Sequence, residues 1–306
     1  MKVIMNDKPE NLRDLVTTYL AEQCRVLIDA EPELRAGEPV VHRTRVAVRR
    51  LRSTLRTCAE LFDQGRVEAL EPELVWWAGL LGAVRDLDIL AERMSAHLTD
   101  LPVELVLGPV ANTITTELAA ERKVQFDEVL RAMDSPRYRA LVIELHRWQT
   151  APPFTDAADV AVKQIAQYVA GAGKKLDKRV EEAAEACRSN NEHADELVHR
   201  ARKTSKRHRY VVELAQPVLG AKAEKIVARR KKLQDVLGDY QDSHVTAGFI
   251  RELGARVGTH EGQNGFTYGV LLGIERQRLQ QLHDVLANSK PGKAEASLLA
   301  LAKSSY

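Results

Sequence analysis

Two short segments of this chain combine a histidine with closely spaced arginine and lysine residues. The first covers residues 41–52 (VHRTRVAVRRLR), the second covers residues 198–209 (VHRARKTSKRHR), and neither contains an acidic residue. Guanidinium and ammonium groups crowded in this way bind anions, and arginine forms paired hydrogen bonds with phosphate oxygens. The residue types therefore predict a site for phosphate groups.

The two segments match each other position by position when their histidines are aligned. The matching positions are His42 with His199, Arg45 with Arg202, Arg49 with Lys206, Arg50 with Arg207, and Arg52 with Arg209. A second pair of motifs, LGAVRDLDI at residues 81–89 and LGDYQDSHV at residues 237–245, follows each segment at nearly the same distance. This order predicts two copies of one helical unit of about 150 residues, packed across a pseudo-two-fold axis.

Each segment has one cationic side when it is drawn as a helix. At about 100° per residue, five basic residues of the first copy fall within an arc of about 80°, opposite its apolar residues. The cationic sides carry His42, Arg45, Arg49, Arg52 and Arg56 in the first copy and His199, Arg202, Lys206 and Arg209 in the second. With a rise of about 1.5 Å per residue the charges span about 20 Å, which suits a chain of phosphates better than a single one.

A charged run on a helix is often a solvated surface, and that alternative applies here as well. Solvated faces usually mix signs, because like charges three or four residues apart cost about 0.2–0.5 kcal/mol per pair. Here the cations crowd one another without acidic neighbours, and a bound anion would offset their repulsion. The pattern therefore favours a ligand site.

The hydrophobic pattern predicts helices almost throughout the chain. Apolar residues recur every three or four positions, as between Leu74 and Leu87, and no window alternates with period two for long. We therefore expect an all-α protein. Glycine, proline and polar clusters predict joints at residues 31–39, 100–102, 134–136, 151–154, 171–173, 189–191, 254–265 and 288–292. Pro152 and Pro153 place the boundary between two repeats, residues 1–150 and 151–306.

The composition argues against several classes of protein. The chain has 45 Lys or Arg and 43 Asp or Glu, so its net charge of +2 matters less than where the cations are concentrated. No apolar run is long enough to span a bilayer, and charged residues and a proline follow the first Met too early for a secretory signal. The three cysteines show neither metal nor disulfide spacing. We expect a cytoplasmic location.

The ordered motifs resemble the CHAD domain, the conserved histidine α-helical domain. The first half has H-x-x-R-V-x-x-R-R-L-R at residues 42–52, followed by L-G-x-x-R-D-x-D at residues 81–88. The second half has H-x-x-R-x-x-x-K-x-x-R-Y-x-x-E at residues 199–213, followed by L-G-x-x-x-D at residues 237–242. The phrase SPRY at residues 135–138 also lies where the family often has a similar one. The resemblance covers nearly the whole chain.

The resemblance implies two four-helix bundles around a central basic channel that binds inorganic polyphosphate, often in proteins of polyphosphate granules. Such domains are frequently joined to a CYTH triphosphatase domain. Its Glu-x-Glu-x-Lys motif is not found at the N-terminus, so we expect the binding domain to stand alone. We expect a binding module without a cofactor and without catalytic activity. Its expected partners are polyphosphate and granule proteins, and not a membrane.

Carried over position by position, the resemblance assigns polyphosphate binding to basic residues of both segments and to one tyrosine. These residues are His42, Arg45, Arg49, Arg50, Arg52, Arg56, His199, Arg202, Lys203, Lys206, Arg207, Arg209 and Tyr210. Four more basic residues on other predicted helices widen the expected surface: Arg85, Arg122, Arg229 and Lys232. The run Lys174, Lys175, Lys178 and Arg179 is a weaker candidate, because acidic residues follow it within helical reach.

Three positions of the second half depart from the pattern of the first. Lys203 stands where the first half has valine, Gln241 where it has arginine, and His208 where it has leucine. Because His208 lies on the apolar side, we expect a hydrogen-bonded core histidine. Tyr210 is either a donor to phosphate or a packing residue, and the sequence leaves both open.

Two other functions fit some of these residues. The paired histidines with Asp86 and Asp242 could form a metal site or serve a metal-dependent phosphohydrolase. The surrounding cations would repel a divalent ion, so we expect the aspartates to orient neighbouring arginines or to cap a turn. Cationic helices also bind nucleic acids, usually with aromatic residues that stack on bases. The chain has 5% aromatic residues, and Trp76, Trp77 and Trp148 lie in patterns typical of a core. Nucleic acid is therefore expected to be a weaker competitor.

Overall fold

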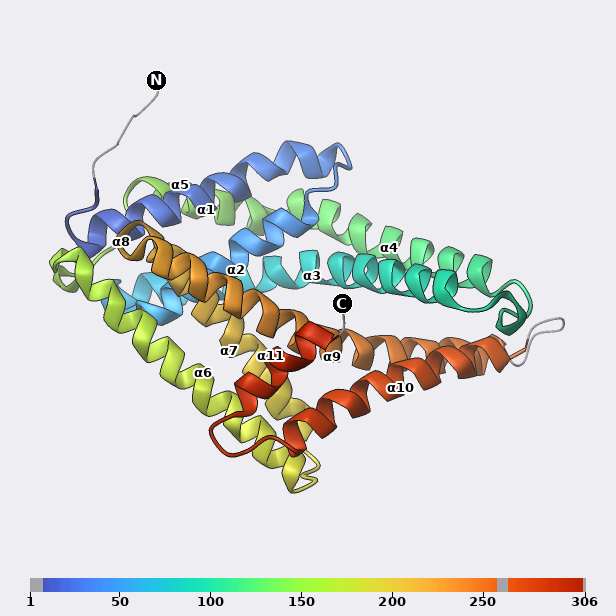
Figure 1. Cartoon of the computed structure of the whole chain (residues 1–306). Helices are drawn as coiled ribbons and strands as arrows, with labels where there is room; N and C mark the ends of the chain where they lie inside the picture. The colour runs from blue at the N-terminus through green and yellow to red at the C-terminus, as the bar shows by residue number, and fades with distance from the viewer. Residues whose placement is uncertain (1–7, 258–263, 305–306) are drawn as a thin grey trace. The chain divides into compact units, whose positions relative to one another are not determined.

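The computed structural model describes residues 8–257 and 264–304, which form eleven α-helices (Figure 1). The first six are α1 (Leu12–Arg35), α2 (Val41–Thr57), α3 (Gln64–Asp100), α4 (Val110–Met133), α5 (Pro136–Thr150) and α6 (Ile165–Arg188). The others are α7 (Ala194–Leu214), α8 (Gln216–Leu219), α9 (Ala221–Val257), α10 (Phe266–Ala287) and α11 (Ala294–Ser304). Short 3-10 helices lie at η1 (Ala59–Leu61), η2 (Val103–Leu105), η3 (Asp156–Asp159) and η4 (Val162–Gln164). The expected all-α class is confirmed.

Two helix starts follow local capping chemistry. Asn11 precedes α1, and its side chain accepts a 2.8 Å hydrogen bond from the backbone N–H of Asp14. Ser135 precedes α5 and accepts one of 3.2 Å from the backbone N–H of Tyr138, with Pro136 at the first helical position. Such caps satisfy backbone groups that have no partner within the helix. The SPRY phrase is therefore a helix start.

One of the predicted joints is wrong, because α6 continues through residues 171–173 from Ile165 to Arg188. A Cβ added at Gly173 would lie 3.4 Å from Nε2 of His208, so the glycine allows close packing there. Each glycine weakens a helix by about 1 kcal/mol. Burial of Ile165 and Leu176, both 0% exposed, opposes this loss. The other predicted joints lie at or directly after helix ends, except that residues 258–263 of the joint at 254–265 are outside the described residues.

The described helices belong to two compact units, each assembled from three stretches of chain. Unit 1 contains Met1–Gly82, Asp127–Leu176 and Thr204–Lys231, and unit 2 contains Ala83–Phe126, Asp177–Lys203 and Lys232–Tyr306. Each unit takes segments from both halves of the sequence. The units therefore do not coincide with the predicted repeats, residues 1–150 and 151–306, and the duplication stays a prediction.

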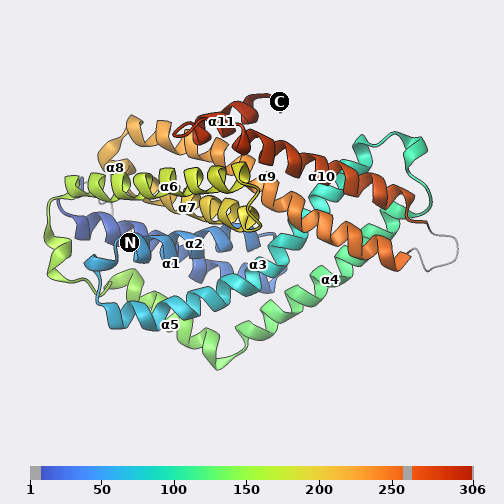
Figure 2. The same cartoon turned by 90° about the horizontal axis from the view of Figure 1, so that it is seen from below.

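Unit 1 has an aromatic core beside α1, which packs against α2 and α5 (Figure 2). The rings of Phe62 and Trp148 lie 5.6 Å apart, and those of Trp77 and Tyr138 lie 4.8 Å apart. Trp77 and Trp148 are buried, as predicted. Trp76 was also expected in the core, but it is only half-buried, and the guanidinium group of Arg137 on α5 lies over its ring.

Unit 2 has a separate hydrophobic core made by four helices. It consists of Leu90 and Met94 of α3, Val110, Ile114 and Leu118 of α4, Ile250, Leu253 and Val257 of α9, and Tyr268 and Leu271 of α10. Residues from both halves of the sequence thus share one core. The apolar faces of these helices bury one another because each has its hydrophobic residues at helical spacing.

Unit 2 also contains a buried ionic network. The carboxylate of Glu275 on α10 is 0% exposed, and it accepts hydrogen bonds of 2.6 and 2.7 Å from Arg93 and lies 2.5 Å from Nε2 of His97. Arg93 also pairs with Asp239 at 2.5 Å. Burial alone would raise the pKa of Glu275, but its hydrogen bonds outweigh burial and lower that pKa to about 2.

Candidate anion-binding site

The first histidine-headed segment forms α2, which buries one side in unit 1. The buried residues are Val41, Thr44, Ala47, Val48, Leu51, Ser53, Thr54 and Leu55. On the cationic side His42 and Arg56 are exposed, and Arg45, Arg49 and Arg52 are half-buried. No side chain caps the start of α2, and its first turn has no acidic residue. The helix therefore depends on its buried side, and the predicted two-sided pattern is confirmed.

The second segment lies in α7, which contributes to both units. His199, Arg202 and Lys203 belong to the stretch in unit 2, whereas Lys206, Arg207, Arg209 and Tyr210 belong to the stretch in unit 1. Unit 1 therefore holds candidate cations from both halves of the sequence, those of α2 and those of the C-terminal part of α7. The hydroxyl of Ser53 on α2 donates a 3.4 Å hydrogen bond to the backbone carbonyl of Arg207, so the two helices touch there.

Arg52 of α2 and Arg207 of α7 are half-buried cations with little compensation. Neither forms an ion pair within the part of the chain that the structure describes, whereas Arg56 beside them pairs with Glu71. Burial and then the charge of Arg56 lower the pKa of both groups. Nε of Arg52 is also buried without a hydrogen-bond partner. The surroundings thus disfavour these charges, and an anion would stabilise them.

Glu213 links the two cationic segments within unit 1. Nε of Arg50 donates a 2.9 Å hydrogen bond to Oε2 of Glu213, and Nε of Arg209 lies 3.4 Å from Oε1. These contacts suit Arg50 and Arg209 to positioning α2 and α7. The sequence pattern assigned Glu213 no role, although its spacing of four residues from Arg209 is a signal for an ion pair.

Tyr210 is a packing residue in this structure. It is 2% exposed, its hydroxyl is buried, and its ring lies 5.0 Å from the guanidinium carbon of Arg209. Of the two roles left open by the sequence, packing is the one that this burial supports. Its aromatic face then holds Arg209 by a cation–π contact.

The two Leu-Gly motifs place a glycine against equivalent arginines. A Cβ added at Gly82 of α3 would lie 3.3 Å from Nη2 of Arg45 in unit 1. A Cβ added at Gly238 of α9 would lie 3.9 Å from Nε of Arg202 in unit 2. Both motifs lie on helices of 37 residues. This correspondence supports the predicted duplication.

The candidate arginines of unit 2 are held by carboxylates. Arg122 donates a 2.6 Å hydrogen bond to Asp88, and Arg85 lies 3.8 Å from the same aspartate and 3.0 Å from Glu92. Arg202 lies 3.7 Å from Asp242, which fits the orienting role expected for that aspartate. Their charge is therefore more compensated than that of Arg52 on α2.

The remaining candidate positions are less defined. Gln241 contacts Nδ1 of His199 in unit 2. Lys203 is exposed on α7, and Arg229 and Lys232 are exposed on α9, so their binding roles stay predictions. In the weaker run, Lys178 and Arg179 pair with Glu182 at 3.9 and 2.6 Å.

His208 is a hydrogen-bonded core histidine, as predicted. It is 4% exposed, and its Nδ1 accepts a 2.9 Å hydrogen bond from Nε of Arg230. An Arg donor at Nδ1 favours the neutral ring with its proton on Nε2, because a protonated Nδ1 could not accept. His208 therefore differs in role from the residues of the cationic sides.

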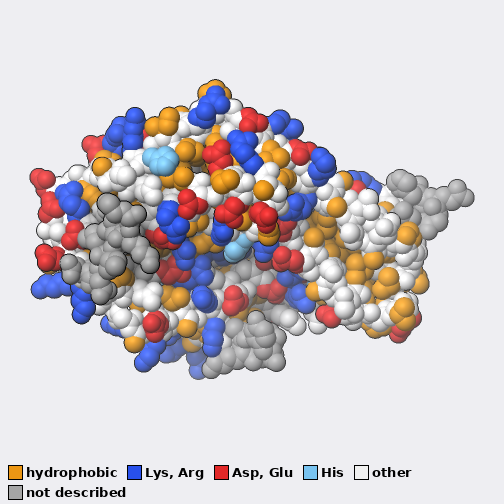
Figure 3. All heavy atoms as spheres, turned by 90° about the horizontal axis from the view of Figure 1, so that it is seen from above, with side chains coloured by type: hydrophobic (Ala, Val, Ile, Leu, Met, Phe, Trp, Pro, Cys, Tyr) orange, Lys and Arg blue, Asp and Glu red, His pale blue; other side chains and the backbone are white. Residues whose placement is uncertain are grey.

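One face of the molecule carries charges of both signs. Figure 3 shows one face, on which Lys and Arg side chains alternate with Asp and Glu side chains. Among the described residues, no three His, Cys, Asp or Glu side chains gather at metal-binding distances. None of the described helices is both long enough and apolar enough to cross a membrane.

Comparisons with known proteins agree with this architecture. PptA from Streptomyces chartreusis has a TM-score of 0.73 at 21% identity, with 96% of this chain and 99% of that one covered. The CHAD domain from the plant Ricinus communis has a TM-score of 0.63 at 22% identity, with 95% and 96% covered. At such identities the likeness shows the fold alone.

Sequence relatives extend the comparison. The uncharacterized proteins MT2285 and Rv2226 of Mycobacterium tuberculosis are each 28% identical over 290 residues, which is 91% of this chain and 53% of theirs. The chain thus spans about half the length of these relatives. Residues 18–251 match the CHAD domain itself, which is most of the chain. This protein therefore belongs to the CHAD domain family.

Proposed function

We propose that this protein binds inorganic polyphosphate through the cations of α2 and α7. The observation that carries the proposal is the pair Arg52 and Arg207, which are half-buried, lack ion pairs among the described residues and have lowered pKa values. A polyanion would supply the compensating charge, and arginine can hold phosphate oxygens with two hydrogen bonds. Membership of the CHAD domain family supports the same ligand.

The physical basis of binding would be electrostatic. Each cation that replaces a counterion of the polyanion makes affinity fall as salt rises, as for other polyelectrolytes. Free histidine has a pKa of about 6.5, and a bound polyanion would raise the pKa of His42 and His199. Affinity should therefore rise as the pH falls from about 8 to about 6.

We further propose that the polyphosphate site is a basic channel lined by residues of both predicted repeats. It acts as a non-catalytic module in the cytoplasm, associated with polyphosphate granules or regulating polyphosphate metabolism. Cations from both halves within unit 1 support this proposal, as does the matching of Gly82 with Gly238 against equivalent arginines. A metal-dependent phosphohydrolase would instead release phosphate, so a phosphate-release assay accompanies the binding assay.

The decisive test is reversal of one charge on each helix. Arg49→Glu combined with Lys206→Glu should abolish binding to polyphosphate of defined length, measured by calorimetry, while helicity stays unchanged. The matched control reverses two exposed cations outside the candidate set, Arg66→Glu with Lys163→Glu, and should retain binding. Survival of binding in the first variant would remove α2 and α7 from the site.

Nucleic acid is the competing ligand class. Polyphosphate should displace single-stranded RNA or DNA of equal charge, because the candidate site offers cations and no exposed aromatic platform. Displacement in the opposite direction would favour nucleic-acid binding.

A further inference from the structure

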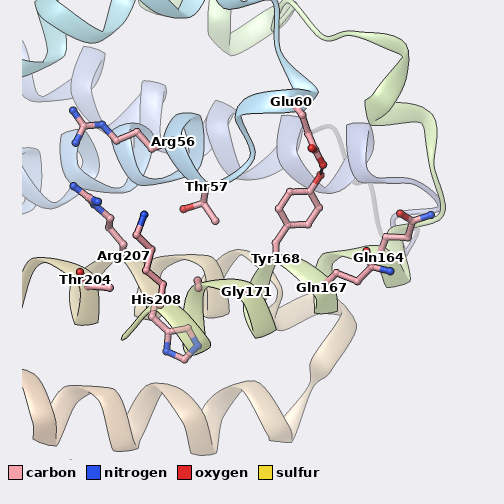
Figure 4. A pocket seen from close by; sticks show the side chains of 12 residues that line it. Arg56, Thr57, Glu60, Gln164, Gln167, Tyr168, Gly171, Thr204, Arg207 and His208 are labelled. Carbon is pink, nitrogen blue, oxygen red and sulfur yellow. Dashed lines mark hydrogen bonds between the residues drawn. The ribbon is translucent and has the colours of Figure 1, made fainter. Parts of the chain in front are cut away.

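Unit 1 contains a pocket next to the end of α2 that the site above does not account for. Its volume is about 690 Å³, and its walls come from α2, η1, η4, α6 and α7 (Figure 4). This volume lies within the range of small-molecule sites, about 300–1,000 Å³. The sequence pattern did not indicate the pocket, because its walls come from segments far apart in the chain.

One end of the pocket is cationic. Arg56 of α2 and Arg207 of α7 extend side by side there (Figure 4), and Lys175 of α6 is a third cation in the lining. Arg207 is half-buried, and burial is the main cause of its lowered pKa. This end can hold the oxygens of one or two phosphoryl groups.

The other end of the pocket is neutral to acidic and rich in hydrogen-bonding groups. Gln164 and Gln167 lie there together with Tyr168, whose hydroxyl donates a hydrogen bond to Glu60 (Figure 4). Burial and the contact with Glu60 raise the pKa of Tyr168, so its hydroxyl keeps its proton. The carboxylate and the amide oxygens are hydrogen-bond acceptors.

A chain of phosphates matches only the cationic end. Polyphosphate offers acceptors and negative charge, so the carboxylate of Glu60 would repel it, and only the NH2 groups of the glutamines could donate hydrogen bonds to it. A ligand that complements both ends carries phosphate at one end and hydroxyl or amine donors at the other. The two ends together thus define the ligand better than either does alone.

We propose that this pocket binds a small phosphorylated molecule whose carrier bears hydroxyl or amine groups, of the nucleoside phosphate class. The phosphates lie between Arg56, Arg207 and Lys175, and the carrier donates hydrogen bonds to Glu60 and the glutamines. The pocket shares Arg56 and Arg207 with the proposed polyphosphate surface, whereas Glu60 and the glutamines lie outside that surface.

Calorimetry with adenosine diphosphate and pyrophosphate tests the proposal, because both probes carry two phosphoryl groups. Adenosine diphosphate should bind about tenfold more tightly, since its hydroxyl and amine groups can donate hydrogen bonds to Glu60 and the glutamines, whereas pyrophosphate has no donor for them. Gly171→Leu should fill the pocket and remove this binding, because a Cβ at Gly171 meets nothing within 4 Å. Gly79→Leu is the matched control, an exposed helical glycine of the same unit with equal free space.

Further outcomes separate the two ligands. Gly171→Leu should leave the affinity for polyphosphate unchanged. Glu60→Gln should lower the affinity for adenosine diphosphate and raise the affinity for pyrophosphate. Equal affinity for the two probes, or full adenosine diphosphate binding by Gly171→Leu, would overturn the proposal. Equal loss of adenosine diphosphate and polyphosphate in Gly171→Leu would also overturn it and make the pocket part of the polyphosphate surface. A wild-type protein that binds adenosine diphosphate but no polyphosphate would refute only the proposed function.

Discussion

The half-buried arginines of α2 and α7 differ in how their charge is compensated. Arg50 and Arg209 are held by the carboxylate of Glu213 on α7, whereas Arg52 and Arg207 form no ion pair among the described residues. A half-buried cation without an acidic partner costs folding free energy, and a bound anion returns it as affinity. At such positions a residue that favours ligand binding lowers the stability of the unbound protein.

Arg207→Gln should weaken polyphosphate binding about tenfold while leaving the free energy of unfolding unchanged or higher. The substitution removes a charge that burial and Arg56 already disfavour. Polyphosphate titration and urea denaturation at low salt measure the two effects.

The control for this prediction is Arg25→Gln on α1. Arg25 is exposed and pairs with Glu22 and Asp29 at 2.8 and 3.0 Å, outside the candidate set. The Arg25→Gln variant loses the same charge as Arg207→Gln, and it should keep the wild-type affinity for polyphosphate. Equal loss of affinity in both variants would show an effect of net charge alone.

Glu275 gives unit 2 a dependence on pH. Its pKa falls from 4.5 to about 2 in the folded protein, so its contribution is present above about pH 4.5 and is lost as the pH falls toward 2. Glu275→Gln should lower the free energy of unfolding by about 3 kcal/mol at pH 7, because it removes the buried carboxylate that pairs with Arg93 and leaves that arginine with Asp239 alone. Urea denaturation between pH 7 and pH 3 should also show a weaker acid dependence in the variant. An acid dependence equal to that of the wild type would contradict this role.

The sequence shows the cations but not their partners. Arg50 lies 163 residues from Glu213, and Arg93 lies 182 residues from Glu275, so no local spacing indicates either contact. The helical wheel correctly separates the buried and cationic sides of α2, because that separation depends on local periodicity alone. Which carboxylate compensates each cation depends on tertiary packing, so the structure was required to identify these partners.

Among the helices, α3 and α9 play matching parts, since each presents a glycine to an arginine of a cationic segment. Gly82→Ala should raise the free energy of unfolding by up to about 1 kcal/mol through helix propensity. It should also weaken polyphosphate binding about threefold, since its Cβ would lie 3.3 Å from Nη2 of Arg45 and displace that side chain. Thermal denaturation and polyphosphate titration measure both.

Gly238→Ala is the matched variant in unit 2. Its Cβ would lie 3.9 Å from Nε of Arg202, an ordinary van der Waals distance, so stability should rise and binding should not change. Equal effects of the two substitutions on affinity would show that the approach of Arg45 to Gly82 is unimportant.

Helix existence is predictable here, and helix continuity is less so. Period-three and period-four apolar residues indicate the helices because each must bury one face. The glycines at residues 171 and 173 also read as a joint, yet α6 continues through them. Local propensity favours a break, and the contact of Gly173 with His208 is a tertiary effect that local propensity does not contain.

Across the whole chain, the sequence repeats and the compact units divide the molecule differently. Unit 1 takes Thr204–Lys231 from the second half, and unit 2 takes Ala83–Phe126 from the first half. The predicted repeats therefore do not correspond to two independently packed copies. Each half leaves apolar residues exposed until the other half covers them.

This exchange of segments predicts that neither half folds alone. Residues 1–150 and residues 151–306, produced separately, should each lack a cooperative thermal transition and should not bind polyphosphate. The core of unit 2 explains why, because Leu90 and Ile114 come from the first half and Ile250 and Leu271 come from the second. Circular dichroism of each half and of the two halves produced together measures the effect, and mixing should restore helicity and binding. A cooperative transition in one isolated half would show that the repeat, and not the compact unit, is the folding unit.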